Sequence, residues 1–355
     1  MARARFLYHH SWTRPRIAVA VAAAAAMAVG GLVTAGTASA GPAPAPHKAK
    51  TAQQTGPAVG ASEVPAHAVT GYWQNFDNGA KTQKLSDVPD DYDIIAVAFA
   101  DATGSPGEVS FKLDPATGYG SEDDFKADIK SLHEAGKSVV VSVGGEKGAV
   151  SVSDDASADA FSSSIVKLMD DYGFDGVDID LENGLNATYM TKALDAVHSK
   201  KSDVVVTMAP QTIDMQSTDT DYFKTALNIK DYLTVVNMQY YNSGSMNGCD
   251  GKTYAQGGVD FLTGLACIQL EGGLDESQVG IGTPASSSAA GSGYVEPKVV
   301  NDALDCLAKG TNCGDYKPEK KYPGIRGAMT WSTNWDASDG NSWSSTVGPH
   351  VDGLG

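Results

Sequence analysis

The sequence predicts a TIM (β/α)8 barrel, a single-domain fold of the α/β class. From Val69 onward, apolar runs rich in β-formers alternate with amphipathic helical runs, the pattern of a parallel sheet with crossover helices. Eight such strand–helix units in about 285 residues match this barrel in number and size. An open doubly wound sheet would carry a glycine-rich phosphate loop after its first strand, and residues 71–79 contain no GxGxxG pattern.

The expected strands are short runs of Val, Ile, Ala and aromatic residues. They cover residues 69–74, 93–100, 138–143, 175–182, 204–209, 233–241, 279–283 and 326–331.

The expected helices lie between these strands and carry apolar residues on one face. A helix from Ser121 ends near Gly136, and a second one stops at Gly173, because glycine readily adopts the left-handed conformation that follows a helix. Further helices are expected over residues 189–201, 222–227, 259–265 and 299–307. A short stretch containing Ser and Trp closes the chain.

Residues 1–40 are predicted to be a signal peptide. Four arginines precede an uncharged, Ala-rich run from Ile17, and Ala-Ser-Ala at residues 38–40 forms a cleavage pattern before Gly41. The run is long enough to be read as a membrane span, but its Ala and Gly content and the cleavage pattern favour export. We therefore expect a secreted, extracellular protein without a membrane anchor after cleavage.

Residues 41–67 are predicted to be a linker rich in Pro, Ala, Gly and Thr, so the folded domain is expected over residues 68–355. The formal net charge is −17, and loss of the four leader arginines would lower it to −21. This charge argues against nucleic acid and anionic membranes as partners, and it also keeps a secreted protein soluble.

The four cysteines of an exported chain can form two disulfides in three connectivities. Proximity in the sequence favours Cys249 with Cys267 and Cys306 with Cys313. Neither pair has metal-site spacing with His partners, and the seven His show no ligand pattern. We expect no metal and no cofactor.

The strand at residues 175–182, Asp-Gly-Val-Asp-Ile-Asp-Leu-Glu, carries the strongest functional signal. In an extended strand Asp178, Asp180 and Glu182 share one face, and the intervening aliphatic residues share the other. Helices cover the outside of a barrel, so this acidic face must point inward, with Glu182 at the C-terminal mouth. Buried acids are costly unless paired or protonated, and neighbouring like charges raise their pKa values, so the pattern indicates a functional site.

Four motifs in chain order resemble those of glycoside hydrolase family 18, the chitinase family. They are Asp-x-x-Asp-x-Asp-x-Glu at 175–182, Ser-x-Gly-Gly at 142–145, Met-Gln-Tyr-Tyr-Asn at 238–242, and Trp331 at the end of the last strand. Gln239 and Asn242 stand where other members have Met and Asp. The resemblance covers about residues 69–355 and leaves the leader and linker unmatched.

The resemblance implies a retaining chitinase that acts on chitin and chitooligosaccharides through substrate-assisted catalysis. Glu182 would be the general acid and later the base on water, and Asp180 would orient the sugar's 2-acetamido group, whose oxygen attacks the anomeric carbon. Asp178 would share a proton with Asp180, and Tyr241 would hold the acetamide oxygen. The implied substrate-binding residues are Tyr72, Gly144, Gly145, Met208, Gln239, Asn242 and Trp331. Asp175 is expected to fix a turn, and Tyr240 to face the helix layer.

One departure from the family pattern concerns the groove. Many members insert a small α+β domain before the last strand, and residues 285–325 leave no room for it. We therefore expect an open substrate groove and an endo-acting enzyme. We also expect a monomer.

Two alternatives remain. An endo-β-N-acetylglucosaminidase acting on N-glycan cores shares the acidic-strand pattern and the barrel size. A chitin-binding lectin of the same fold typically lacks the terminal Glu, which is present here as Glu182.

Overall fold

The computed structural model describes residues 64–355. The predicted signal peptide at 1–40 and the predicted linker up to residue 63 lie outside the described residues. Within residues 64–355, no helix is both long and apolar enough to cross a membrane.

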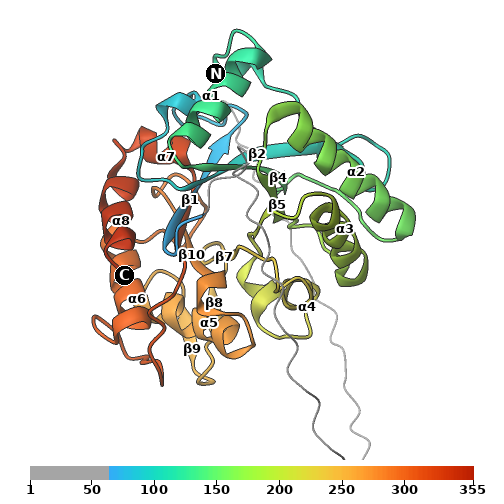
Figure 1. The fold of residues 1–355 in the computed structure, drawn as a ribbon. Helices are drawn as coiled ribbons and strands as arrows, with labels where there is room; N and C mark the ends of the chain where they lie inside the picture. Colours follow the sequence, from blue (N-terminus) through green and yellow to red (C-terminus); the bar gives the residue numbers. More distant parts are fainter. Residues whose placement is uncertain (1–63) are drawn as a thin grey trace, which may run out of the picture. The chain divides into compact units, whose positions relative to one another are not determined.

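The predicted (β/α)8 barrel is confirmed (Figure 1). Its parallel strands follow the order β1-β11-β10-β7-β6-β5-β4-β2, and the pairing of β1 with β2 closes the ring. The strands are β1 (Ala68–Gln74), β2 (Ile94–Ala102), β4 (Ser138–Gly144), β5 (Gly176–Asp180), β6 (Val205–Met208), β7 (Val235–Gln239), β10 (Val279–Pro284) and β11 (Gly327–Trp331).

The helices form the outer layer around the strands, with α2 beside α3 and α6 beside α8 (Figure 1). The first helix follows Ser121, as the sequence predicts, and the Ser121 side chain caps it. Gly173 ends the second helix, also as predicted, in the left-handed conformation at φ 83°. The helices are α1 (Glu122–Glu134), α2 (Asp155–Tyr172), α3 (Ala187–Lys200), α4 (Asp221–Asn228), α5 (Val259–Glu271), α6 (Pro297–Lys309), α7 (Thr333–Ser338) and α8 (Ser342–Asp352).

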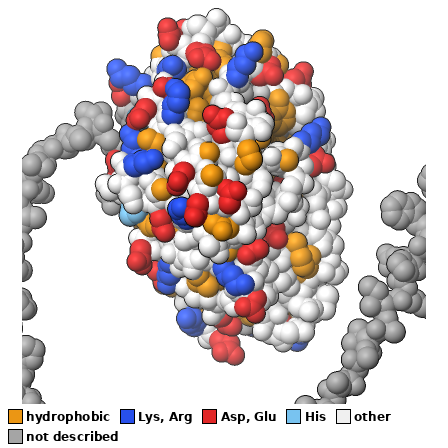
Figure 2. Space-filling view, turned by 90° about the vertical axis from the view of Figure 1, so that its right-hand side faces the viewer, with side chains coloured by type: hydrophobic (Ala, Val, Ile, Leu, Met, Phe, Trp, Pro, Cys, Tyr) orange, Lys and Arg blue, Asp and Glu red, His pale blue; other side chains and the backbone are white. Residues whose placement is uncertain are grey.

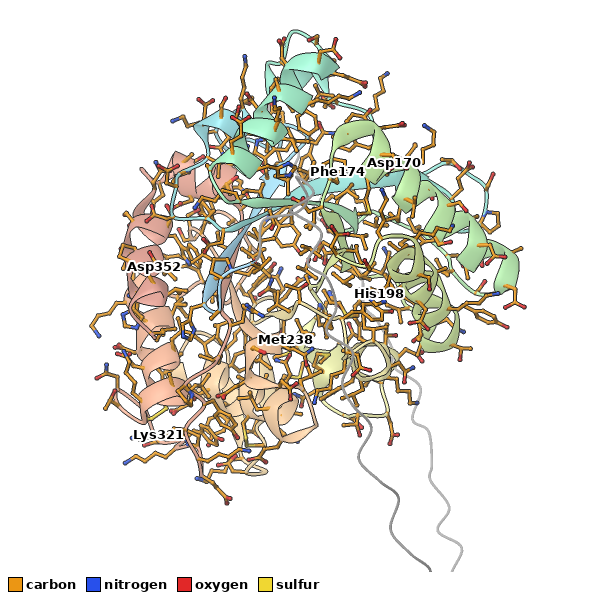
Figure 3. The ribbon with its side chains drawn as sticks, in the orientation of Figure 1. Asp170, Phe174, His198, Met238, Lys321 and Asp352 are labelled. Carbon is orange, nitrogen blue, oxygen red and sulfur yellow. A yellow bond between two sulfur atoms is a disulfide. The ribbon has the colours of Figure 1, made fainter. Side chains whose placement is uncertain are left out.

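Strand alternation divides the apolar side chains into two clusters. The inner cluster fills the barrel and consists of Tyr72, Ile94, Ala96, Ala98, Val140, Val205, Ala209, Val235 and Met329. The outer cluster lies between strands and helices and includes Phe174, just before β5, whose ring lies 5.8 Å from that of Phe111. Figure 3 labels Phe174 together with Met238, a further outer-cluster residue, on β7. The residue that precedes the acidic strand is therefore packed among aromatic side chains between the strands and the helices.

The sequence did not predict several short elements. Strand β3 (Val109–Ser110) pairs antiparallel with β2, and β8 (Ser245–Asn247) forms a hairpin with β9 (Thr253–Ala255). The Ser/Trp-containing stretch at the C-terminus forms helices α7 and α8.

Buried Asp336 joins these two helices to the barrel. Its carboxylate accepts hydrogen bonds from the Tyr92 hydroxyl at 2.8 Å and from the backbone amides of Trp343 at 2.8 Å and Ser344 at 3.3 Å. Trp343 and Ser344 lie in the first turn of α8, so Asp336 caps that helix from α7.

The packed fold starts slightly before the predicted boundary at residue 68. Val64 packs against the inner cluster, and the His67 ring nitrogen Nδ1 lies 2.8 Å from the carbonyl oxygen of Ile325. The end of the predicted linker is thus part of the barrel.

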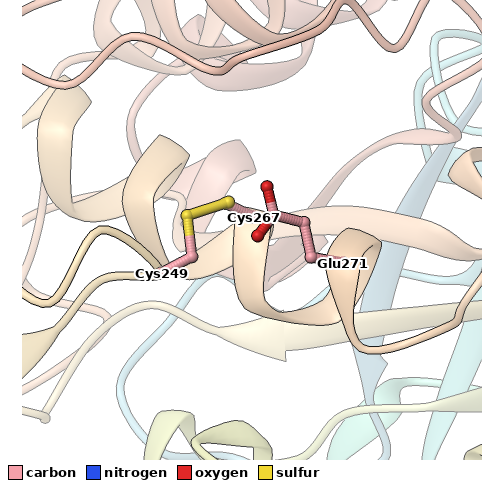
Figure 4. A group of neighbouring side chains, drawn as sticks. All are labelled: Cys249, Cys267 and Glu271. Atoms are coloured by element: carbon pink, nitrogen blue, oxygen red, sulfur yellow. A yellow bond between two sulfur atoms is a disulfide. The ribbon is translucent and has the colours of Figure 1, made fainter.

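Both predicted disulfides are confirmed. Cys249 pairs with Cys267 at a Cα–Cα distance of 5.8 Å, and Cys306 pairs with Cys313 at 4.8 Å. Figure 4 shows Glu271 beside the first bridge. Cys249, Cys267 and Glu271 are the one trio in residues 64–355 whose potential metal-binding atoms lie within 4.8 Å of one another. The two sulfur atoms are bonded to each other, so they offer no thiolate ligands.

The outer surface is mixed in charge. On the face drawn in Figure 2, acidic and basic side chains are interspersed, with hydrophobic side chains scattered among them.

Candidate active site

The acidic face of β5 points into the barrel, as predicted. Asp178 and Asp180 are 1% and 4% exposed, and the strand ends at Asp180. Glu182 follows two residues later and is half-buried. The three carboxylates thus run from the barrel interior to its C-terminal mouth.

Asp178 is held by hydroxyl groups from three other strands. Its Oδ2 atom accepts hydrogen bonds from the Tyr72 hydroxyl and Ser142 Oγ, each at 2.7 Å, and its Oδ1 atom accepts one from Thr207 Oγ1 at 2.7 Å. Burial raises the pKa of Asp178, while these three donors oppose that rise by stabilising the anion. Asp178 is therefore fixed in one orientation.

Asp180 is bound by one side-chain amide. Gln239 Nε2 donates to Asp180 Oδ1 at 2.8 Å. Burial and the charges of Asp178 and Glu182 raise the pKa of Asp180 well above its ordinary value. Because full ionisation of this cluster is unfavourable, the group favours retention of a proton among its members.

Glu182 has two amide neighbours at the mouth. Gln239 Nε2 lies 3.3 Å from Glu182 Oε1, and Gln211 Nε2 lies 3.3 Å from Oε2. Burial raises the pKa of Glu182, the Gln239 hydrogen bond lowers it, and the charges of Glu146 and Asp214 raise it further. A carboxyl group with a raised pKa suits a proton donor near neutral pH.

A small pocket of about 160 Å³ opens beside this carboxyl group. Its lining consists of Leu181, Glu182, Gly184, Leu185, Asp214, Asp221 and Tyr222. The pocket thus lies between the segment after β5, the turn that contains Asp214 and the start of α4.

Tyr241 lies just beyond β7 and is 8% exposed. Burial raises the pKa of Tyr241, and the charges of Asp180, Glu182 and Asp178 raise it further, so its phenol stays protonated. Among residues 64–355, burial and charges but no hydrogen bond influence its hydroxyl, which is thus available to donate to a ligand. Tyr240 faces the other way, as predicted, and its hydroxyl accepts from Gln269 Nε2 of α5 at 3.1 Å.

Trp331 belongs to an aromatic group at the mouth. Its ring stacks on Phe99 at 5.8 Å and on Phe76 at 6.3 Å, and it contacts Tyr72 at 5.6 Å. Phe76, Phe99 and Trp331 are only partly buried, and we call them the aromatic platform. Such a surface can support the apolar face of a sugar ring.

Gly144 and Gly145 shape the backbone beside Asp180. Gly144 has φ +124°, and a Cβ atom there would lie 2.1 Å from the Asp180 carbonyl oxygen. Gly145 has φ +73°, and its amide donates to that same oxygen at 2.7 Å. Both glycines are thus needed to hold the end of β5, and their contact with substrate stays a prediction.

Asn242 is engaged within the protein. It has φ +53°, and its Oδ1 atom accepts a hydrogen bond from the Ser292 amide at 3.0 Å. It thus fixes the loop after β7, and a role in binding substrate stays a prediction.

The prediction that Met208 lines the site is wrong. Thr207 and Ala209 face the barrel interior, so Met208 between them faces the helices, where it is fully buried in the outer cluster. Asp175 also lies away from the mouth, where its Oδ2 atom contacts His133 Nε2 at 2.8 Å and the Val139 amide at 2.7 Å.

Sequence reasoning placed Tyr72 and Gln239 in the site but did not identify Thr207, Ser142 and Gln211 as partners of the carboxylates. Thr207 and Ser142 were detectable, since both lie on inner faces of predicted strands. Gln211 follows β6 outside any regular strand, and only the folded structure brings it to Glu182.

The comparisons with known proteins agree with this geometry. The family model "Glycosyl hydrolases family 18" matches residues 68–343. Exochitinase 1 of Streptomyces olivaceoviridis is 36% identical over 342 residues, which is 82% of this chain and 57% of that protein. The chain spans about three-fifths of the length of the first curated relatives that it matches.

Two solved structures are also similar. A Streptomyces coelicolor protein provisionally named Chitinase A is 68% identical with a TM-score of 0.81, and the match covers 81% of this chain and 99% of that one. A family GH18 chitinase from Chromobacterium violaceum is 34% identical with a TM-score of 0.76, over 82% of this chain and 85% of that one.

Proposed function

Because the chain belongs to glycosyl hydrolase family 18, we propose that it is a chitinase that hydrolyses β-1,4 linkages between N-acetylglucosamine units. The observation that carries this proposal is the pair Glu182 and Asp180, bridged by the amide of Gln239 at the barrel mouth. The names of its relatives support the same substrate class.

Glu182 protonates the glycosidic oxygen in this mechanism. Its raised pKa favours the protonated form in the free enzyme, and after the leaving group departs, the resulting carboxylate accepts a proton from the attacking water. Gln211 and Gln239 hold its two oxygen atoms in place through their amide donors.

The nucleophile is the acetamide oxygen of the substrate. A protein carboxylate would have to act on the face opposite the leaving group. Asp178 and Asp180 project from β5 and Glu182 follows it by two residues, so all three approach the sugar from one side. Asp180 accepts the acetamide N–H, and Tyr241 donates to the acetamide oxygen. The resulting oxazolinium ion is opened by water, and the product retains the β configuration.

Asp178 stabilises Asp180 during this cycle. Its three hydroxyl donors let it carry negative charge inside the barrel while Asp180 is protonated, and the proton can be shared between them as charge develops on the substrate. The aromatic platform supports the sugar ring from below.

We propose endo action because the substrate groove is expected to be open. Between β10 and β11 the structure has the single helix α6 and loops, so the chain offers no additional domain there to build a second wall. We infer that the enzyme is secreted and acts as a monomer on internal linkages of chitin chains.

One incubation tests this function. The protein is incubated with the N-acetylglucosamine hexamer, and the products are followed by mass spectrometry. We expect early dimers, trimers and tetramers. Release of N-glycans without cleavage of the hexamer would instead identify an endo-β-N-acetylglucosaminidase, and binding without cleavage would identify a lectin.

A further inference from the structure

Gln74 is a buried side chain that the fold leaves without polar partners. It is the last residue of β1 and 2% exposed, and neither its amide nitrogen nor its amide oxygen has a hydrogen bond. No other side chain in residues 64–355 has two buried polar atoms in this condition. A buried amide without partners is costly, so its presence requires an explanation.

Gln74 lies on the inner face of β1 at the barrel mouth. Tyr72, two residues earlier, faces the interior, while Trp73 belongs to the outer cluster and the Asn75 side chain donates to the Lys112 carbonyl oxygen at 2.8 Å. Alternation therefore places Gln74 on the same face of β1 as Tyr72.

The residues of the aromatic platform are close to Gln74 in the sequence and on the neighbouring strand. The rings of Tyr72 and Phe76, on either side of Gln74 in the sequence, lie 5.6 Å and 6.3 Å from that of Trp331. On the next strand, Gln74 is in register with Ala98, the residue before Phe99. Gln74 thus lies at the end of β1 that leads into the platform, next to the strand that carries Phe99.

The fold itself makes no use of this amide. The backbone amide of Gln74 is already bound by Asn334 Oδ1 at 2.9 Å, so the strand end is fixed without the side chain. An apolar side chain of the same length, such as methionine, would fill the space without leaving polar atoms unpaired.

We propose that Gln74 is a sugar-binding residue whose amide gains its partners when N-acetylglucosamine rests on the aromatic platform. A sugar hydroxyl both donates and accepts, so it matches the amide's donor and acceptor, either directly or through one water molecule. The three platform rings are only partly buried, and the proposal requires them to shift so that the sugar reaches the buried amide. This inference rests on the proposed chitinase function.

The test uses Gln74→Met, an apolar change of similar length. Two quantities are measured: the Kd of the thiazoline mimic of the oxazolinium intermediate, by calorimetry, and the urea midpoint of unfolding. We expect at least tenfold weaker thiazoline binding with an unchanged or higher urea midpoint. A purely structural role of Gln74 would leave the Kd unchanged.

Gln269→Met is the matched control. Gln269 is equally buried, but its amide donates to Tyr240 in the outer layer, away from the mouth. We expect this variant to lose stability and to keep the wild-type Kd. A crystal structure of the wild-type protein with thiazoline serves as a second measurement if Gln74→Met does not fold. It should show a ligand atom or a bridging water within hydrogen-bond distance of the Gln74 amide.

Two results would overturn the proposal for Gln74 alone: wild-type Kd in a folded Gln74→Met protein, or a complex whose ligand and waters leave the amide without a partner. If the wild-type protein does not bind thiazoline, the substrate-assisted mechanism fails as well.

Discussion

Asp178, Asp180 and Glu182 carry the same chemical group, but each carboxylate lies in different surroundings at the end of β5 or just after it. Asp178 has three hydroxyl donors, Asp180 has one amide donor, and Glu182 shares that amide at the half-open mouth. These differences favour distinct tasks for chemically similar groups, because hydrogen bonds and burial set each group's pKa.

Replacing Glu182 with Gln tests the proton donor. The amide preserves the shape but cannot protonate a leaving group, so we expect kcat to fall by roughly 10²–10⁴, with thiazoline binding and folding retained. The same change at exposed Glu134, on α1, serves as the control and should keep kcat within about tenfold of wild type. Near-normal turnover by folded Glu182→Gln would refute the assignment.

Replacing Asp214 with Asn tests how the pKa of Glu182 is set. The negative charge of Asp214 contributes to raising that pKa, so its removal should lower the pKa, and Glu182 should lose its proton at lower pH. The basic limb of the pH–kcat profile should therefore move to lower pH. Asp221, which lines the same pocket, provides the control, and Asp221→Asn should shift the limb less. A limb that stays in place or moves to higher pH in Asp214→Asn would contradict this account.

At the scale of elements, the eight strands were predictable because each is a compact apolar run between turn signals. Helices α7 and α8 were not, because α7 has only six residues and α8 contains Pro349. Their stability comes from the hydrogen bonds that Asp336 of α7 makes to Tyr92 and to the first turn of α8, and from the burial of Trp343. No local sequence pattern reveals these contacts.

The candidate site was also predictable only in part. Alternation gave the orientation of Asp178, Asp180, Glu182 and Tyr241, and the same rule applied to Thr207 would have excluded Met208. Gln211 and the unpartnered amide of Gln74 depend on how separate elements meet, so only the structure reveals them.

Replacing Asp336 with Ala tests the C-terminal helices. The change leaves the Tyr92 hydroxyl and two amides of α8 unpaired, so we expect the free energy of unfolding to fall by at least about 2 kcal/mol. Urea unfolding measures this loss. Asp339→Ala, at an exposed position after α7, should change stability by less than about 0.5 kcal/mol. Equal stability of the two variants would show that Asp336 does not anchor α8.

At the scale of the whole molecule, the barrel brings residues from separate strands to one mouth. Tyr72 comes from β1, Gln239 from β7 and Trp331 from β11, while the acids come from β5. A rigid ring of strands is what keeps donors such as Tyr72, Ser142 and Thr207 within 2.7 Å of one buried carboxylate. The central claim is that this ring holds the substrate's own acetamide group as the nucleophile.

The configuration of the first-formed product tests that claim most directly. The hexamer is hydrolysed in an NMR tube, and the anomeric protons are recorded before mutarotation mixes the two forms. Participation of the acetamide group inverts the anomeric carbon twice, so we expect the β anomer to appear first. Initial release of the α anomer would mean a single displacement by water and would contradict the account.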